Sequence, residues 1–124
     1  MADENTGKLP FMNRAALTSL RIAPYLPANW YLLPFVRSYV DDIYGIARGV
    51  AERAGEATAR RVDAIHDYIT ASTAFYDSMV ARLEQRYEDS RQRFRDGLVS
   101  IGAFINSILD IRQQQRFAHA EAAA

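Results

Sequence analysis

The sequence predicts an all-α protein, an extended helical hairpin or small bundle that follows a segment rich in proline and aromatic residues. Two observations predict this class. Apolar residues recur at alternating spacings of four and three along most of the 124-residue chain, and no proline follows Pro34. Apolar and polar residues do not alternate in the way typical of strands, so the helical period is the one that the pattern supports.

The first part of the chain divides into a tail and a segment interrupted by prolines. Residues 1–9 are expected to form a polar tail. In residues 10–35, Asn13 is a suitable N-cap for a short helix that ends at Pro24. The stretch "LRIAPYLPANWYLLPF" follows, with three prolines that favour extended or turning backbone. Asn29 is a suitable cap for the next helix.

Residues 36–118 are predicted to form a long helical region with a continuous apolar seam. The seam comprises Val36, Val40, Ile43, Ala47, Val50, Ala54, Val62, Ile65, Ile69, Tyr76, Met79, Leu83, Tyr87, Phe94, Leu98, Ile101, Ile105 and Ile108. One unbroken helix of this length would reach roughly 120 Å. We therefore expect two long helices that fold back near residues 55–60, with a second break at 96–97 as a further option. Residues 119–124 are expected to fray.

Composition and motifs argue against several classes of function. The formal net charge is zero, whereas nucleic-acid binding favours an excess of basic residues. The absence of cysteine excludes disulfides, iron–sulfur clusters and thiolate zinc sites. His66, flanked by Asp63 and Asp67, fits a surface histidine beside carboxylates better than a metal site. Without a phosphate-binding loop or catalytic motif, we expect no enzyme activity, cofactor or small-molecule substrate.

The sequence also bears on location. The first residues lack the apolar region of a secretory signal. The longest uncharged stretch, from Ile22 to Val36, contains three prolines and is shorter than the roughly 20 residues that a membrane-spanning helix needs. We therefore expect an intracellular protein without a transmembrane helix, cytoplasmic or organellar, with a membrane surface as one location.

The aromatic residues of the proline-rich segment are the first candidates for partner binding. They are Tyr25, Trp30, Tyr31, Phe35 and Tyr39. Prolines stiffen the segment, and large aromatic side chains are typical anchors of protein interfaces. Two alternatives remain, namely contact with lipid headgroups, where tryptophan and tyrosine are enriched, and an internal cap over the end of the helices.

A row of small residues is the second candidate. Ala47, Ala51, Gly55 and Ala59 recur every four residues, and small side chains allow two helices to approach closely. The helix packed against this row could belong to the same chain or to another protein.

The remaining stretches are explained by packing and solvation. Residues 82–96 are highly charged and are expected to form a solvated helix face, with Glu88–Arg91 and Asp89–Arg93 at spacings that allow ion pairs. Residues 97–111 carry an apolar face with almost no basic residues beside it, which favours burial against protein over a membrane surface.

These features together predict a non-catalytic structural or accessory subunit that packs into a larger protein assembly, which includes assembly with itself. The first alternative is a peripheral protein that coats a membrane, lipid droplet or granule. In its long amphipathic helices, mixed charge and lack of cysteine, the chain resembles two groups of lipid-surface proteins, the phasins and the perilipin-like droplet proteins, without a shared motif. The second alternative is a self-assembling coiled coil.

Overall fold

The computed structural model describes residues 9–123, and it confirms the all-α class. No strand occurs within this range. In chain order the elements are α2 (Phe11–Ile22), the 3₁₀ helices η1 (Ala23–Tyr25) and η2 (Pro27–Leu32), α3 (Pro34–Arg37), α4 (Val40–Ala54), α5 (Glu56–Leu83) and α6 (Tyr87–Ala123). Of the polar tail expected over residues 1–9, residues 1–8 lie outside the described range, and Leu9 is buried.

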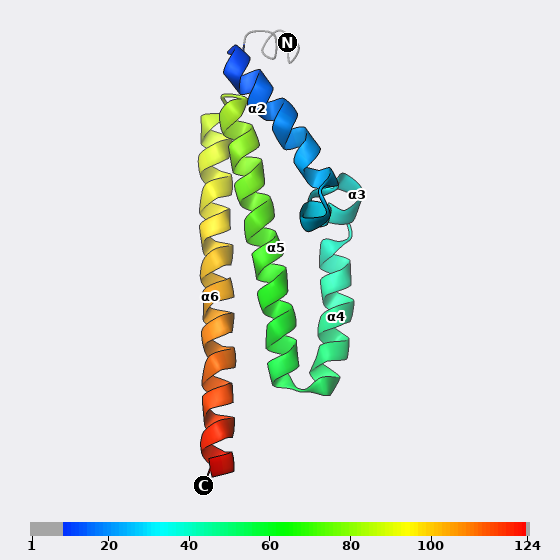
Figure 1. The fold of residues 1–124 in the computed structure, drawn as a ribbon, viewed down its shortest axis with the longest axis vertical. Coiled ribbons are helices and arrows are strands. Elements are labelled where there is room, and N and C mark those ends of the chain that lie inside the picture. Colours follow the sequence, from blue (N-terminus) through cyan, green and yellow to red (C-terminus); the bar gives the residue numbers. More distant parts are fainter. Residues whose placement is uncertain (1–8, 124) are drawn as a thin grey trace.

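The three long helices lie side by side in one layer (Figure 1). Helix α5 occupies the middle and packs against both α4 and α6, and each neighbour runs antiparallel to it. Helix α2 begins beside the C-terminal end of α5 and diverges from it toward α3 (Figure 1). With 37 residues against 28 in α5, α6 continues past the end of its neighbour.

Helix α2 is fixed to α5 by two long-range hydrogen bonds. Asn13, expected as an N-cap, instead donates from Nδ2 to the carbonyl oxygen of Leu83 at 2.9 Å. The helix begins at Phe11, two residues before Asn13. The hydroxyl of Tyr76 donates to the carbonyl oxygen of Leu20 at 2.7 Å. Leu17, which lies between Asn13 and Leu20 in the sequence, is buried. Helix α2 therefore covers the last turns of α5.

The breaks between the long helices follow local backbone geometry. Gly55 separates α4 from α5 with a φ of 124°, a conformation that favours glycine, and it lies where residues 55–60 were expected to turn. The second turn lies at residues 84–86, where Gln85 has a φ of 63°. Helix α6 instead continues through residues 96–97 and on to Ala123, so the option of a second break there and fraying over 119–123 do not match the structure.

Small side chains form the contact between α5 and α6. Buried residues spaced by seven lie on the facing sides, with Ala64, Ala71 and Ser78 on α5 and Ser90 and Gly97 on α6, and Ser107 and Ile111 are buried further along α6. Small residues at the contact let the two backbones approach closely. The described residues include no large side chain that is fully buried, so this seam replaces a conventional core.

Two details show how close the helices are. Ser78 Oγ donates to the carbonyl oxygen of Ser90 at 2.8 Å, and Ser90 Oγ donates to that of Ser78 at 2.9 Å. Seven residues further along α6, a Cβ atom added to Gly97 would lie 2.6 Å from Cε1 of Phe75. The close approach of Phe75 therefore requires glycine at position 97. This glycine, within α6, serves packing and does not end the helix.

A pair of glycine substitutions tests this seam. Gly102 is also inside α6, but an added Cβ atom there meets nothing within 4 Å. Gly102→Ala should therefore stabilise the chain by up to about 1 kcal/mol through helix propensity. Gly97→Ala gains the same propensity but overpacks the seam at a cost of about 1–3 kcal/mol. Urea unfolding followed by circular dichroism should give the lower midpoint for Gly97→Ala, and equal midpoints would contradict the close contact.

Candidate functional site

The aromatic segment is a series of short helical turns rather than an extended strand. Asn29 does not cap a helix, and its Nδ2 donates to the carbonyl oxygen of Ala23 at 3.2 Å. Pro24 and Leu32 are buried beneath the segment. Four of the five predicted aromatic residues are at least half exposed, namely Tyr25, Trp30, Phe35 and Tyr39. The fifth, Tyr31, is half-buried and lies edge-on to Trp30.

An apolar groove of about 200 Å³ links the aromatic segment to the long helices. Trp30 lies at its edge, and its walls are Ile43, Tyr44 and Ala47 from α4 and Val62, Ile65 and Ile69 from α5. The groove therefore brings together two residues predicted as partner-binding, Trp30 and Ala47, which the sequence placed in separate patterns.

The row of small residues lies around the turn between α4 and α5. Ala51 is 6% exposed and Ala59 is 1% exposed, so both are buried within the chain. Gly55 forms the exposed turn, and Ala47 is half-buried at the groove. The helix packed against Ala51 and Ala59 is thus one of the same chain. The partner-binding role of the four residues stays a prediction.

A polar cluster joins α4 to α5 beside the groove. The ring of Tyr44 stacks on that of His66 with centroids 4.0 Å apart, and its hydroxyl donates to Asp63 at 2.5 Å. That hydrogen bond is the main cause of a raised pKa for Tyr44, with smaller contributions from burial and the Asp63 charge. Arg48 pairs with Asp63 at 2.9 Å, and His66 lies 3.0 Å from Asp41. This cluster aligns the two helices.

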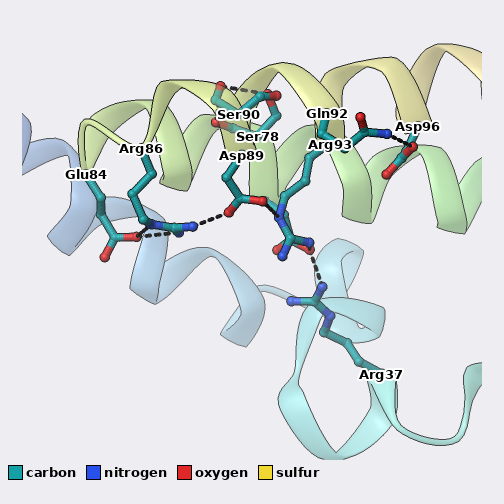
Figure 2. A network of polar contacts seen from close by, with 10 residues as sticks. Arg37, Ser78, Glu84, Arg86, Asp89, Ser90, Gln92, Arg93 and Asp96 are labelled. Carbon is teal, nitrogen blue, oxygen red and sulfur yellow. Dashed lines mark hydrogen bonds and ion pairs between the residues drawn. The ribbon is translucent and has the colours of Figure 1, made fainter.

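Ion pairs connect α3 to the α5–α6 pair on one side of the layer (Figure 2). Arg37 of α3 reaches Asp77 of α5 at 2.5 Å, and Arg93 of α6 approaches the same carboxylate at 3.4 Å. Arg93 also pairs with Asp89 at 3.1 Å, which confirms one of the two predicted pairs. The other, Glu88 with Arg91, is present at 2.5 Å. Arg37 thereby fixes the aromatic segment to the long helices.

The opposite side of the layer presents large apolar side chains. On α6, Arg93 points to Asp77, whereas the ring of the next residue, Phe94, lies 5.5 Å from that of Phe75. Positions spaced by three or four from Phe94 share its side of the helix. With their equivalents on α4 and α5, the exposed residues on this side are Ile43, Ile46, Val50, Ile65, Tyr68, Leu98, Ile105 and Leu109, which we call the apolar face.

The apolar face continues across helices. Ile43 and Ile65 line the same groove, and the ring of Tyr68 lies 5.7 Å from that of Phe104, so α4, α5 and α6 contribute to one surface. Each of its eight side chains is at least 49% exposed. Helix α2 contacts α5 near the C-terminal end of that helix, at Tyr76 and Leu83. The face is therefore left without a covering element over most of its length.

A basic hollow lies between the last turns of α5 and the first turns of α6. It has a volume of about 430 Å³, and Arg82, Arg91 and Arg95 line it together with Met79 and Phe94. Arg91 pairs with Glu88. Within residues 9–123, neither Arg82 nor Arg95 has an ion pair. Positive charge is thus available next to an apolar surface.

Four residues of the apolar face, Ile43, Ile65, Leu98 and Ile105, belong to the apolar seam that the sequence predicts. The structure leaves them exposed, because the neighbouring Ala, Ser and Gly positions make the internal contacts. The seven-residue spacing of those small residues was the signal that could have separated the two stripes.

Comparisons with protein-family models, with curated proteins and with solved structures find nothing that matches the chain. Within residues 9–123, no helix combines the length and apolar character that crossing a membrane requires. Over the same range, no group of three or more His, Asp or Glu side chains is placed to hold a metal ion.

Substitution of Arg37 tests whether its ion pair positions the aromatic segment. The pair is partly buried, with the Asp77 side chain 18% exposed, and should contribute about 1 kcal/mol. In Arg37→Ala, we expect amide hydrogen exchange to accelerate roughly fivefold over residues 23–39 and to stay unchanged in α5 and α6. Arg95→Ala, a control without an ion pair in this part of the chain, should change neither region. Equal exchange in both variants would show that apolar packing alone holds the segment.

Proposed function

We propose that the chain is a non-catalytic structural subunit that packs by helix–helix and aromatic contacts into a larger protein assembly. One observation supports this proposal above the others, namely the exposed apolar face that spans three helices without a covering element. Exposed apolar surface of this extent marks sites where proteins associate, because water contact with it is unfavourable.

The aromatic segment supports the same function. Trp30 lies at the edge of the groove that Ile43 and Ile65 share, so the segment adjoins the apolar face. Large aromatic side chains on backbone fixed by prolines and by the Arg37–Asp77 pair lose little entropy when they bind. We propose protein partners for this surface and no nucleic acid, because the formal net charge is zero.

The mass of the chain in extracts of its own cells tests the proposal. The chain has a mass of 14.0 kDa, and we expect the wild-type protein to sediment as a larger species. Ile65→Glu places a charge in the middle of the apolar face and should shift the chain to the monomer, because burial of an unpaired carboxylate is unfavourable.

The matched control is Val99→Glu. Val99 is 75% exposed on α6, but its position lies away from the side of the helix that Phe94 and Leu98 share. It should leave the assembly intact. A wild-type chain that sediments at 14.0 kDa in the extract would contradict the proposed function.

A second function, the coating of a lipid surface, is favoured by the basic hollow. Arg82 and Arg95 could neutralise anionic headgroups while Met79, Phe94 and the adjoining apolar face enter the acyl region. In that case the purified chain should float with phosphatidylglycerol vesicles, and the double variant Arg82→Glu/Arg95→Glu should lose this binding. Flotation that is the same in both proteins would contradict an electrostatic role for the hollow.

A further inference from the structure

The exposed surface area of the chain is larger than that expected for a compact monomer of the same mass. It exposes 8864 Å². A compact monomer of 14.0 kDa should expose about 6,700 Å², so the excess is of order 2,000 Å². A standard protein interface buries about 800 Å² on each partner, and obligate dimers bury more. The excess is therefore enough for one extensive interface on this chain.

The apolar face is the part of the exposed surface that is best suited to form this interface. It lies on a flat layer of helices, whereas the opposite side carries the ion pairs of Arg37, Asp77 and Arg93 (Figures 1 and 2). A flat layer with one apolar side becomes a two-layer helical bundle when a second layer covers it. The 28 residues of α5 give this layer a length of about 42 Å, which is sufficient for an interface of standard size.

We infer that the occupant of the apolar face is a second copy of the same chain, so that two three-helix layers pack face to face. This inference rests on the proposed function and names the partner. None of the eight residues of the face is charged, so these eight side chains can pack against their copies in a second chain without repulsion between like charges. Closed two-fold symmetry is also the commonest arrangement of soluble homo-oligomers, and it brings the same patch of both copies together.

The positions of α2 and of the basic hollow limit which part of the apolar face contacts the second copy. Helix α2 contacts α5 at Tyr76 and Leu83, so the contact between the two copies is centred further from α2, around Ile65 and Tyr68. Leu98 and Ile105 flank these residues on α6. The arginines of the basic hollow lie at one end of the face and remain outside the centre of the contact.

The test uses the purified full-length chain in sedimentation velocity, without other proteins or lipid. We expect a species of twice 14.0 kDa that dissociates on dilution. Leu98→Glu introduces a carboxylate into both halves of a two-fold interface, and it should weaken the dimer by about a hundredfold or more. Val99→Glu, the adjacent exposed apolar position on another side of α6, should leave dissociation unchanged.

A second measurement remains informative if Leu98→Glu does not fold. The chain has no cysteine, so Leu98→Cys and Val99→Cys each introduce a single thiol. In the dimer, alkylation of the thiol at position 98 should be slowed at least tenfold relative to that at position 99, and dilution should remove the difference. Circular dichroism confirms that the helices of both variants are intact.

Four results would overturn the inference. The first is a monomer at all concentrations whose two thiols react equally fast. The second is loss of the dimer in Val99→Glu as well as in Leu98→Glu, which would place the interface elsewhere. The third is protection of position 98 only when phosphatidylglycerol vesicles are added, which would assign the face to lipid. A purified monomer that is part of a larger species in cell extract would overturn the second copy but not the proposed function.

Discussion

The close contact between α5 and α6 determines the shape of the rest of the molecule. Ser78 and Ser90 exchange hydrogen bonds across it, and Gly97 lies directly against the ring of Phe75. Such proximity requires small side chains at every facing position. Small side chains remove little apolar area from water, so the contact is specific in geometry but buries little apolar surface. The large apolar residues of both helices are consequently displaced to the flanks of the contact.

The two flanks have different chemistry, which gives the layer two distinct sides. On one side Asp77 receives Arg37 from α3 and Arg93 from α6, and these partly exposed pairs position elements more than they stabilise them. On the other side Phe75 contacts Phe94, and Tyr68 contacts Phe104. Because α4 joins the edge of α5 instead of covering this second side, the apolar surface extends across all three helices.

The helical class was predictable from the sequence because the apolar period is long and uninterrupted, and the turn at Gly55 was predictable because glycine is the residue that readily adopts its φ of 124°. The turn at Gln85 was not, since its φ of 63° is carried by a residue with no such preference. In the sequence, Gly97 suggests a break in the helix, but in the structure glycine is required there for the packing of Phe75. The groove at Trp30 could not be predicted either, because it depends on how the short turns place residues that are distant in sequence.

The apolar seam in the sequence also has a different meaning from the one its periodicity first indicates. The largest apolar residues, such as Ile65, Leu98 and Ile105, define the hydrophobic pattern of the sequence. The buried contact instead uses the small residues Ala64, Ala71 and Ser78. A chain that needed only its own hairpin would gain nothing from maintaining a second, stronger apolar stripe, because exposed apolar surface favours aggregation. Under the proposed function, the strongest hydrophobic signal in this sequence belongs to a contact with a partner that a single copy does not make. Folding and association are then linked, since binding to the folded layer stabilises it by mass action.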